Sequence, residues 1–381
     1  MLNNRKIKTF ETLDKKYRES ENKVVVLFKP ENIFYLTGFW GEGISVISED
    51  EGKNSQTTNL LVPKLEYSRA LNNSSECNVI SSDRGTALIN GFMTLIKDND
   101  FVFLDNNDFD IISKMQSKIG NKNIIADNNL LYDTRQIKDK IEIENIKKAS
   151  KIIDKLFEIT KEELKENITE EHLQSILVFE AMKQGARFPP YIYTSNPLII
   201  ASGPNGSFPH AETSSKKIQS GEFIVIDITL CYNHYVSDAT RTFAVGQVSK
   251  EMTETYQTVK IAQQNGIEYI KKTNDFMDID FCCRDYINSK KMGEYFTHST
   301  GHGIGLEVHE PPWIRPDVHS KIKESMTITV EPGIYIENRF GVRIEDSLLI
   351  TKKKREVEEE ADNKPFDYIN LHSFSKELLV L

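Results

Sequence analysis

The sequence has few cysteines and no long apolar run. Its four cysteines, Cys77, Cys231, Cys282 and Cys283, lack CxxC spacing and suggest neither a zinc ribbon nor a disulfide framework. No hydrophobic stretch approaches the roughly 20 residues that a membrane helix needs. Polar residues follow Met1, so no secretory signal is expected. The sequence therefore predicts a cytoplasmic protein that does not contact a membrane.

Positive charge is also in the minority. The chain has 48 Lys and Arg against 57 Asp and Glu, a formal net charge of -9. Such a balance repels backbone phosphates, so nucleic acid is not expected as a main partner. Hydrophobic residues make up 39% and charged residues 28% of the 381 positions. These values are normal for a soluble globular protein, and the length allows two domains of ordinary size.

The first part of the chain alternates short apolar strands with helical patterns. The runs 24–28, 59–62 and 101–104 have the composition of buried strands, and helical stretches separate them. This alternation predicts an α/β domain over residues 1–130. A linker is expected over residues 131–140.

From residue 141 onward the pattern predicts helices over an antiparallel sheet. Apolar residues recur at helical spacing from Ile143 to Ile159, and a second helix is expected from an N-cap at Thr169 to a stop at Gly185. Strand-like runs then follow, with one more helix over about 252–271. The strand-like runs cover residues 223–230, 240–245, 327–330 and 347–350. This arrangement is typical of an α+β domain.

Four carboxylates stand next to these strand-like runs. Asp227 is expected to close the apolar strand 223–226, and Asp238 follows eleven residues later. Glu331 follows the run 327–330, and Glu345 is flanked by strand-forming residues. Any one of them alone is typical of a turn or of a salt bridge. A buried carboxylate without a partner is costly, however, so the set calls for a cation or for several hydrogen bonds.

One histidine, His302, is surrounded by glycines in the segment Gly301-His302-Gly303-Ile304-Gly305. Glycines allow the backbone to approach another group closely. Two divalent cations would balance the formal charge of the four carboxylates. Oxygen ligands with one imidazole suit manganese, cobalt, iron or zinc, and two such ions about 3.5 Å apart can activate water and polarise a carbonyl. The composite predicts a metal centre.

Together these motifs resemble the pita-bread metallopeptidases: prolidase (Xaa-Pro dipeptidase), Xaa-Pro aminopeptidase and methionine aminopeptidase. The segment Asn32–Phe39 resembles a signature of their creatinase-like N-terminal domain. The segment Arg135–Lys138, followed by Glu142 and Ile143, resembles the start of their catalytic domain. The resemblance covers nearly the whole chain. It implies an α+β pita-bread (creatinase/aminopeptidase-like) catalytic domain over residues 141–381, with an α/β creatinase-like domain before it.

The resemblance also implies a role for each motif residue. Asp227 would chelate one metal and His302 the other, while Asp238 and Glu345 would bridge the two. Glu331 would ligate the second metal and shuttle a proton as a general base does.

Further residues match positions around the reacting bond. His210 corresponds to a histidine that contacts the substrate near the scissile bond, and His309 to one that steadies its carbonyl or the tetrahedral intermediate. Arg343 would orient nearby carboxylates. The resemblance further implies a homodimer.

The chain departs from the family pattern at several positions. Thr229 stands where the family commonly has glycine, and His234 precedes Tyr235 where Gly-Tyr is frequent. Trp313 occupies a slot that is often arginine in dipeptidases, and Arg315 lies two residues further on. Arg315 is therefore the candidate for binding the free carboxylate of a dipeptide. If it cannot reach, an aminopeptidase acting on longer peptides is favoured.

The sequence thus predicts a two-metal hydrolase that cleaves the Xaa-Pro bond at the N-terminus of dipeptides or short peptides. Manganese or cobalt is favoured, with zinc and iron as alternatives. Methionine aminopeptidases usually lack a separate N-terminal domain, and creatinase works without metal, so both are less consistent with this chain. A non-catalytic peptide- or protein-binding relative would typically have lost ligands, and none is missing here.

Overall fold

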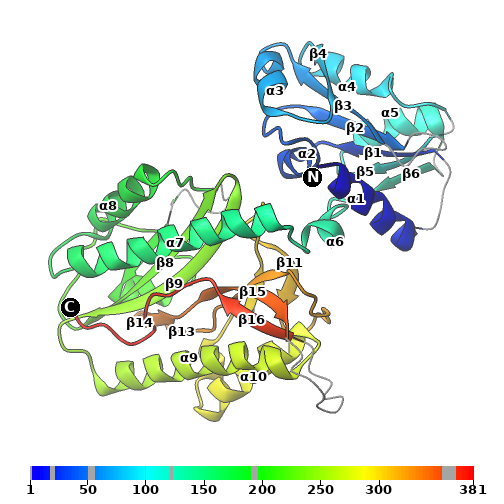
Figure 1. The fold of residues 1–381 in the computed structure, drawn as a ribbon. Coiled ribbons are helices and arrows are strands. Elements are labelled where there is room, and N and C mark those ends of the chain that lie inside the picture. The colour runs from blue at the N-terminus through cyan, green and yellow to red at the C-terminus, as the bar shows by residue number, and fades with distance from the viewer. Residues whose placement is uncertain are drawn as a thin grey trace. The chain divides into compact units, whose positions relative to one another are not determined.

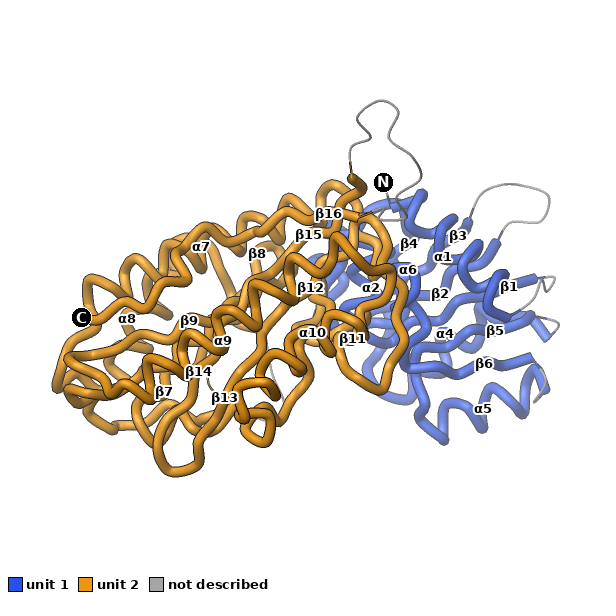
Figure 2. The backbone as a smooth tube through the Cα atoms, turned by 90° about the horizontal axis from the view of Figure 1, so that it is seen from below, with its two compact units in different colours: residues 1–135 blue, residues 136–381 orange. Residues whose placement is uncertain are grey.

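The computed structural model describes residues 2–17, 22–49, 56–98, 100–120, 123–189, 196, 198–353 and 366–381. The chain divides into two compact units, residues 1–135 and 136–381 (Figure 2). The division falls inside the stretch 131–140, where a linker is expected. All four cysteines are free. Among the described residues, no helix combines the length and apolar character needed to cross a membrane.

The first unit is built on a six-stranded sheet with the order β4-β3-β2-β1-β5-β6 (Figure 1). β1 pairs parallel with β5 and antiparallel with β2, and the outer strands β4 and β6 run parallel to their neighbours. The strands are β1 (Lys23–Leu27), β2 (Ile44–Glu49), β3 (Gln56–Pro63), β4 (Asn78–Ser82), β5 (Phe101–Leu104) and β6 (Ile124–Ala126), and the helices are α1 (Leu2–Tyr17), α2 (Pro30–Thr37), α3 (Tyr67–Asn73), α4 (Thr86–Met93), α5 (Phe109–Ile119) and α6 (Tyr132–Arg135).

Both faces of this sheet are covered. Val24 and Val26 of β1 pack with Phe92 of α4 and with α5 on one face. On the other face the ring of Tyr17, in α1, lies 5.6 Å from that of Phe103. Every residue of β1 is buried, as the apolar composition of the segment predicts for a central strand. The α/β class expected for this part is confirmed.

Two helices open the second unit. α7 (Lys140–Glu163) begins with a capping box in which Asp139 and Glu142 satisfy each other's backbone N–H groups. α8 (Glu170–Lys183) begins after Thr169, whose hydroxyl accepts a hydrogen bond of 3.1 Å from His172 N–H. The predicted N-cap is therefore confirmed, and the helix ends just before Gly185, which has a φ of +85°.

The strands of the second unit form a three-stranded sheet β7-β8-β9, a five-stranded sheet β11-β10-β12-β15-β16 and the pair β13-β14. All of these pairings are antiparallel, as predicted. The elements are β7 (Ile199–Ser202), η2 (Gly203–Ser207), β8 (Glu222–Tyr232), β9 (Tyr235–Val245), α9 (Lys250–Tyr269), η3 (Ile270–Lys272), α10 (Phe276–Ser289), η4 (Gly293–Tyr295), β10 (Gly301–Gly303), β11 (Glu310–Ile314), β12 (Thr327–Val330), β13 (Gly333–Ile336), β14 (Phe340–Arg343), β15 (Asp346–Lys352) and β16 (Phe366–Asn370).

Helices cover the two larger sheets from opposite sides (Figure 1). α7 lies over β8 and β9, where Phe157 packs with Ile226 and Ile228. α9 and α10 cover the five-stranded sheet, and their side chains join Val330 and Ile350 in a second apolar cluster. The faces of the strands turned away from these helices are left to form the functional site.

A buried ion pair fixes the start of this unit. Lys138 Nζ lies 2.8 Å from Glu310 Oε1, and the two side chains are 1% and 2% exposed. Glu310 begins β11, directly after His309 in the chain. The carboxylate of Glu310 also lies under Gly305, where an added Cβ would stand 2.5 Å from Glu310 Oε1. The pair therefore braces the loop that connects His302 to His309.

We predict that Lys138→Met lowers the free energy of unfolding by about 3–5 kcal/mol, because it removes the cation that balances the buried Glu310 carboxylate. The double variant Lys138→Met/Glu310→Leu should recover much of the loss. Chemical denaturation of both measures the effect. As a control, Lys183→Met removes an exposed pair with Glu180 and should cost less than about 1 kcal/mol. Equal losses for Lys138→Met and this control would contradict the prediction.

Candidate metal centre

The hairpin of β8 and β9 supplies two of the predicted ligands. Asp227 pairs with Thr240, and Thr229 pairs with Asp238. Residues opposite each other in an antiparallel pair, and residues two apart in one strand, point to the same face. These four side chains therefore gather on one face of the hairpin, while Ile228 and its neighbours on the other face pack under α7.

The expectation that Asp227 closes its strand is wrong. β8 continues five residues further to Tyr232, and Asp238 likewise lies inside β9. The alternation Ile226, Asp227, Ile228 shows why: the carboxylate interrupts the apolar run because it faces the other side of the sheet. Its position is set by the strand pairing and not by a strand end.

The other three predicted ligands come from the opposite side of the unit. His302 is the central residue of β10, Glu331 follows β12 directly, and Glu345 lies between β14 and β15. The glycines around His302 are required by packing, because a Cβ on Gly301 would lie 2.1 Å from the backbone oxygen of Thr329. Glu345 N–H donates to Thr240 O over 3.1 Å, which joins this side to the hairpin.

The structure brings all five predicted ligands together. Asp238, His302 and Glu345 each offer one ligand atom, and these atoms lie within 4.8 Å of one another. Glu331 Oε1 lies 3.2 Å from His302 Nε2. Asp227 is joined to the group through Arg343, whose guanidinium donates to Asp227 Oδ2 over 2.6 Å.

Two oxygens of this group are suited to a cation. Asp227 Oδ1 and Glu345 Oε1 are buried and accept no hydrogen bond from the described residues. A buried carboxylate oxygen without a partner costs free energy, and native proteins rarely leave one unsatisfied. Carboxylate oxygens with one imidazole are ligands that divalent transition metals accept. The residues present therefore fit divalent metal ions.

The electrostatics of the cluster point the same way. Burial raises the pKa of Asp238 and of Glu345 well above the usual range. Repulsion from Asp227 and Glu331 raises both pKa values further, and the charge of Asp238 adds to the shift of Glu345. Burial also acts to raise the pKa of Glu331, but the hydrogen bond and charge of His302 outweigh it and lower that pKa to about 2. The cluster thus holds more negative charge than its protein neighbours can balance.

Arg343 connects the ligands to the cavity wall. Besides Asp227, its guanidinium donates to Tyr335 Oη over 2.6 Å and to Thr240 Oγ1 over 3.1 Å. Thr240 in turn donates to Glu345 Oε2 over 2.7 Å. Thr240 and Tyr335 had not been singled out in the sequence, although Thr240 lies two residues after Asp238 in a strand and so faces the same side.

A cavity of about 530 Å³ opens next to the ligands. His210 and His309 line it, as the resemblance implies for residues that touch substrate. Burial lowers the pKa of His309 to about 4, so this imidazole is neutral at pH 7. The described lining residues are Pro189, Asn196, Leu198, Ile199, Pro209, His210, Ala211, Asp227, Thr229, Asp238, His298, Ser299, His302, Val308, His309, Trp313, Glu331 and Arg343.

One further histidine in the cavity was missed. His298 donates or accepts a hydrogen bond of 3.0 Å with Tyr335 Oη, and its ring lies 5.4 Å from that of Tyr335. Burial lowers its pKa. The only sequence signal was its position four residues before His302. In an irregular loop, a spacing of four residues does not show that two side chains face the same way. The place of His298 in the cavity therefore depends on tertiary structure.

The structure does not bring Arg315 to the cavity. Its guanidinium is bonded to Asp317, the side chain is 47% exposed, and Arg315 is absent from the described lining residues. Trp313 lines the cavity instead.

The two hairpin departures have structural consequences. Thr229 lines the cavity, and its hydroxyl donates to Asp238 Oδ1 over 2.8 Å. His234 lies in the turn between β8 and β9 with a φ of +71°, in the left-handed region that favours glycine. Compared with the glycine that is common in the family, Thr229 adds a methyl group and a hydroxyl to the cavity wall. His234 adopts the backbone conformation of the turn at some cost in backbone strain.

Comparison with known proteins agrees with this geometry. Residues 144–352 match metallopeptidase family M24, and residues 10–156 match the creatinase/prolidase N-terminal domain. The chain belongs to metallopeptidase family M24. It is 34% identical over 337 residues to the Xaa-Pro dipeptidase of Pyrococcus furiosus, which covers 87% of this chain and 92% of that protein.

Solved structures of other M24-like proteins superpose on the whole chain. The prolidase from Pyrococcus horikoshii OT3 has a TM-score of 0.84 at 30% identity and covers 99% of this chain and 100% of its own. The X-Pro aminopeptidase from Thermotoga maritima MSB8 has a TM-score of 0.81 at 28% identity and covers 97% of this chain and 99% of its own. The expected resemblance and fold class are confirmed, and membership of M24 implies divalent metal ions.

We predict that chelation of divalent metal lowers the unfolding temperature and that Mn²⁺ restores it, because cations bound only by the folded chain stabilise it. At a free metal concentration of about 100 times Kd, one site contributes about 2.7 kcal/mol. Differential scanning fluorimetry measures the shift. Glu345→Gln should reduce the response to metal, whereas Glu337→Gln, on an exposed turn, should retain it. Identical unfolding temperatures with chelator and with Mn²⁺ would contradict the prediction.

Proposed function

We propose that this member of M24 hydrolyses the peptide bond between an N-terminal residue and a following proline, in dipeptides or short peptides. The observation that carries the proposal is the convergence of five candidate ligand side chains beside a cavity that His210 and His309 also line. The names of its relatives, Xaa-Pro dipeptidase and X-Pro aminopeptidase, support the choice of proline.

Two divalent ions would occupy the centre. Asp227 would hold one, His302 and Glu331 the other, and Asp238 and Glu345 would bridge them. When bound, such a pair supplies Lewis acidity that polarises the scissile carbonyl and makes water a nucleophile at neutral pH. We favour Mn²⁺ or Co²⁺, with Zn²⁺ or Fe²⁺ as alternatives, because the donors are mostly carboxylate oxygens with a single imidazole.

Glu331 is the proton carrier in this proposal. One of its oxygens is held by His302 at 3.2 Å and by Thr329 Oγ1 at 3.3 Å. The carboxylate accepts a proton from the attacking water and delivers it to the nitrogen of proline as the C–N bond breaks. Proton transfer by a positioned side chain typically contributes about 10²–10⁴ in rate.

The histidines of the cavity act on the substrate carbonyl. Neutral His309 keeps one N–H donor, and we assign it to the carbonyl oxygen as negative charge develops there. His210, on the segment after η2, contacts the substrate near the scissile bond. Leu198, Ile199 and Val308 give the cavity an apolar wall, which suits the hydrocarbon ring of proline.

The preferred length of the substrate depends on whether a cation binds the free carboxylate that a dipeptide carries directly after its proline. With Arg315 bonded to Asp317, we favour peptides that continue beyond proline, and dipeptides remain the alternative. We also propose that the protein is a homodimer, as the resemblance implies, which light scattering of the purified protein tests.

We predict that the purified protein with Mn²⁺ or Co²⁺ cleaves Ala-Pro-Ala and releases alanine. When the proline ring packs against the apolar wall of the cavity, the carbonyl before proline lies next to the candidate metal ligands. Amino-acid analysis of the products measures this cleavage. Ala-Ala-Ala and Met-Ala-Ala are matched controls and should be cleaved more than about tenfold slower. Equal cleavage of all three would contradict a proline-directed site, and cleavage of Ala-Pro faster than Ala-Pro-Ala would assign a dipeptidase.

We predict that Glu331→Gln lowers kcat by about 10²–10⁴, because the amide cannot accept and return the proton. Steady-state kinetics on Ala-Pro-Ala at saturating metal measure the loss. Glu337→Gln makes the same chemical change at an exposed position and should leave kcat unchanged. A Glu331→Gln variant that keeps wild-type kcat would remove Glu331 from the assigned role.

A further inference from the structure

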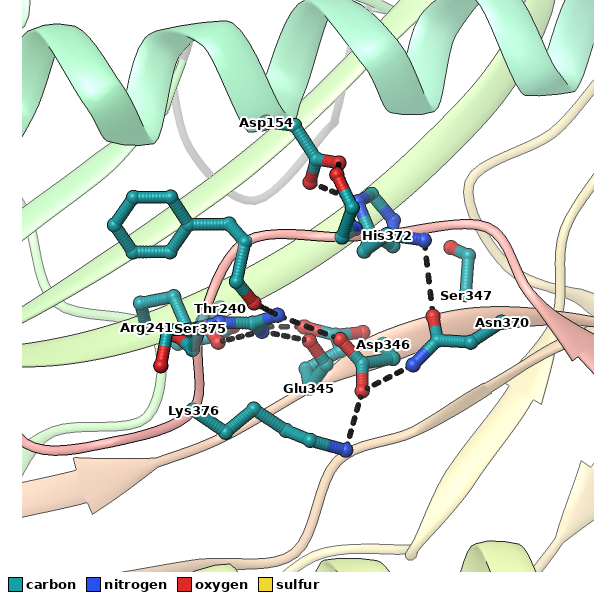
Figure 3. Close-up of polar contacts among 12 residues, drawn as sticks. Asp154, Thr240, Arg241, Glu345, Asp346, Ser347, Asn370, His372, Ser375 and Lys376 are labelled. Atoms are coloured by element: carbon teal, nitrogen blue, oxygen red, sulfur yellow. Dashed lines mark hydrogen bonds and ion pairs between the residues drawn. The ribbon is translucent and has the colours of Figure 1, made fainter.

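A second layer of buried polar residues lies next to the candidate ligand Glu345 (Figure 3). It is on the face of β9 opposite to Thr240, because successive side chains of a strand point to opposite faces. Its centre is Arg241, which is next to Thr240 in β9 and is 2% exposed. The five N–H donors of a guanidinium are matched by five hydrogen bonds here. They reach Glu345 O at 2.6 Å, Asp346 Oδ1 at 2.7 Å, Thr240 O at 2.9 Å, Phe374 O at 2.9 Å and Ser375 O at 3.2 Å.

Asp346 is the anionic partner of this layer and follows the candidate ligand Glu345 directly. Its second oxygen accepts from Lys376 Nζ at 2.9 Å and from Asn370 Nδ2 at 3.0 Å. The Asp346 side chain is fully buried, whereas that of Lys376 is 26% exposed. Asn370 and Lys376 are the two ends of a C-terminal segment, Asn370–Lys376. This segment therefore supplies part of the positive charge and hydrogen bonding that balance Asp346, next to Glu345.

The same segment reaches the other bridging ligand through Ser347. The Ser347 hydroxyl donates to Asp238 O over 2.7 Å and accepts from Asp238 N over 3.2 Å. Ser347 O in turn accepts from Leu371 N over 3.0 Å. His372 adds a contact at Ser237, where its Nε2 lies 3.4 Å from the hydroxyl.

The middle of the segment is anchored on α7. Asp154 Oδ1 lies 3.2 Å from His372 Nδ1, and Asp154 Oδ2 accepts from Ser373 N over 2.6 Å. Figure 3 shows Asp154 reaching His372 from the helix, and Asn370 and Lys376 of the segment reaching Asp346 of β15. The segment is therefore held by α7 in its middle, while its two ends, Asn370 and Lys376, contact Asp346 next to Glu345.

This arrangement matters because the two bridging ligands come from different sheets. Asp238 belongs to β9 of the three-stranded sheet, and Glu345 directly precedes β15 of the five-stranded sheet. Their carboxylates repel each other, yet a shared metal pair requires them to keep a fixed separation. Functional sites need positions held to about 0.5 Å by supporting contacts.

We propose that the segment Asn370–Lys376 is a positioning clamp for the bridging carboxylates Asp238 and Glu345, acting through Arg241, Asp346 and Ser347. None of these three touches substrate, so their role is positioning. The inference rests on the proposed metal centre but not on the preference for proline. Loss of a group that orients a metal ligand typically lowers metal affinity by about 10–100-fold.

The test compares Lys376→Met with Lys260→Met. Lys260, on α9, binds Glu377, the residue directly after the segment, and among the described residues it makes no ion pair with Asp346. Equilibrium dialysis gives the Mn²⁺ affinity of each purified full-length variant, and scanning fluorimetry gives the stability of the metal-free protein. We expect at least about tenfold weaker Mn²⁺ binding for Lys376→Met, affinity within twofold of wild type for Lys260→Met, and similar metal-free unfolding temperatures for the two.

Ser347→Ala gives an independent arm, because it cuts the contact with Asp238 and leaves the charges in place. It should also bind Mn²⁺ about tenfold more weakly and alter the EPR spectrum of the bound Mn²⁺ pair. Wild-type affinity for both Ser347→Ala and Lys376→Met would overturn the clamp, whatever their stability. Wild-type protein that binds no Mn²⁺ would overturn the metal centre and the clamp together. Mn²⁺ binding without cleavage of proline peptides would overturn the proposed function alone.

Discussion

The mutual repulsion of four carboxylates in a buried site is the constraint on which the second unit depends. Asp227, Asp238, Glu331 and Glu345 converge although each is costly to bury. Arg343 directly balances the charge of Asp227, and His302 partly balances that of Glu331. The two buried oxygens without hydrogen bonds, on Asp227 and Glu345, mark where positive charge from outside the chain is still needed. Divalent cations held by these residues would resolve this imbalance and would also supply the Lewis acidity that the proposed reaction needs.

The architecture keeps these charges in place from behind. The hairpin β8–β9 presents two carboxylates on one face, while its other face packs against α7. The remaining candidate ligands lie within β10, directly after β12 and directly before β15, in the sheet that α9 and α10 cover. Arg241 and Asp346 join the two halves on the face of β9 opposite to Thr240. The substrate side is thereby left to histidines and apolar residues, which fits a peptide with a hydrocarbon ring next to its reacting bond.

Much of this could be predicted from the sequence, because the signals were local. The N-cap at Thr169 and the composition of β1 follow from short-range rules, and the five ligand positions followed from motifs. Asp227 was misplaced to a strand end because a single polar residue in an apolar run looks like a boundary. His298 and Arg241 could not be assigned, since the side chains that they bind, Tyr335 and Asp346, lie 37 and 105 residues away in the chain. Trp313 lies within β11 and lines the cavity, whereas Arg315 lies just beyond the end of that strand.

The central claim is that five side chains bind two divalent ions. They are Asp227, Asp238, His302, Glu331 and Glu345. The claim is tested most directly by counting the ions bound per chain, using equilibrium dialysis against Co²⁺ followed by elemental analysis. The account predicts two ions for the wild-type protein and fewer for Asp238→Ala, which removes a bridging ligand. Wild-type protein that binds no ion, or an Asp238→Ala variant that still binds two with unchanged affinity, would contradict it.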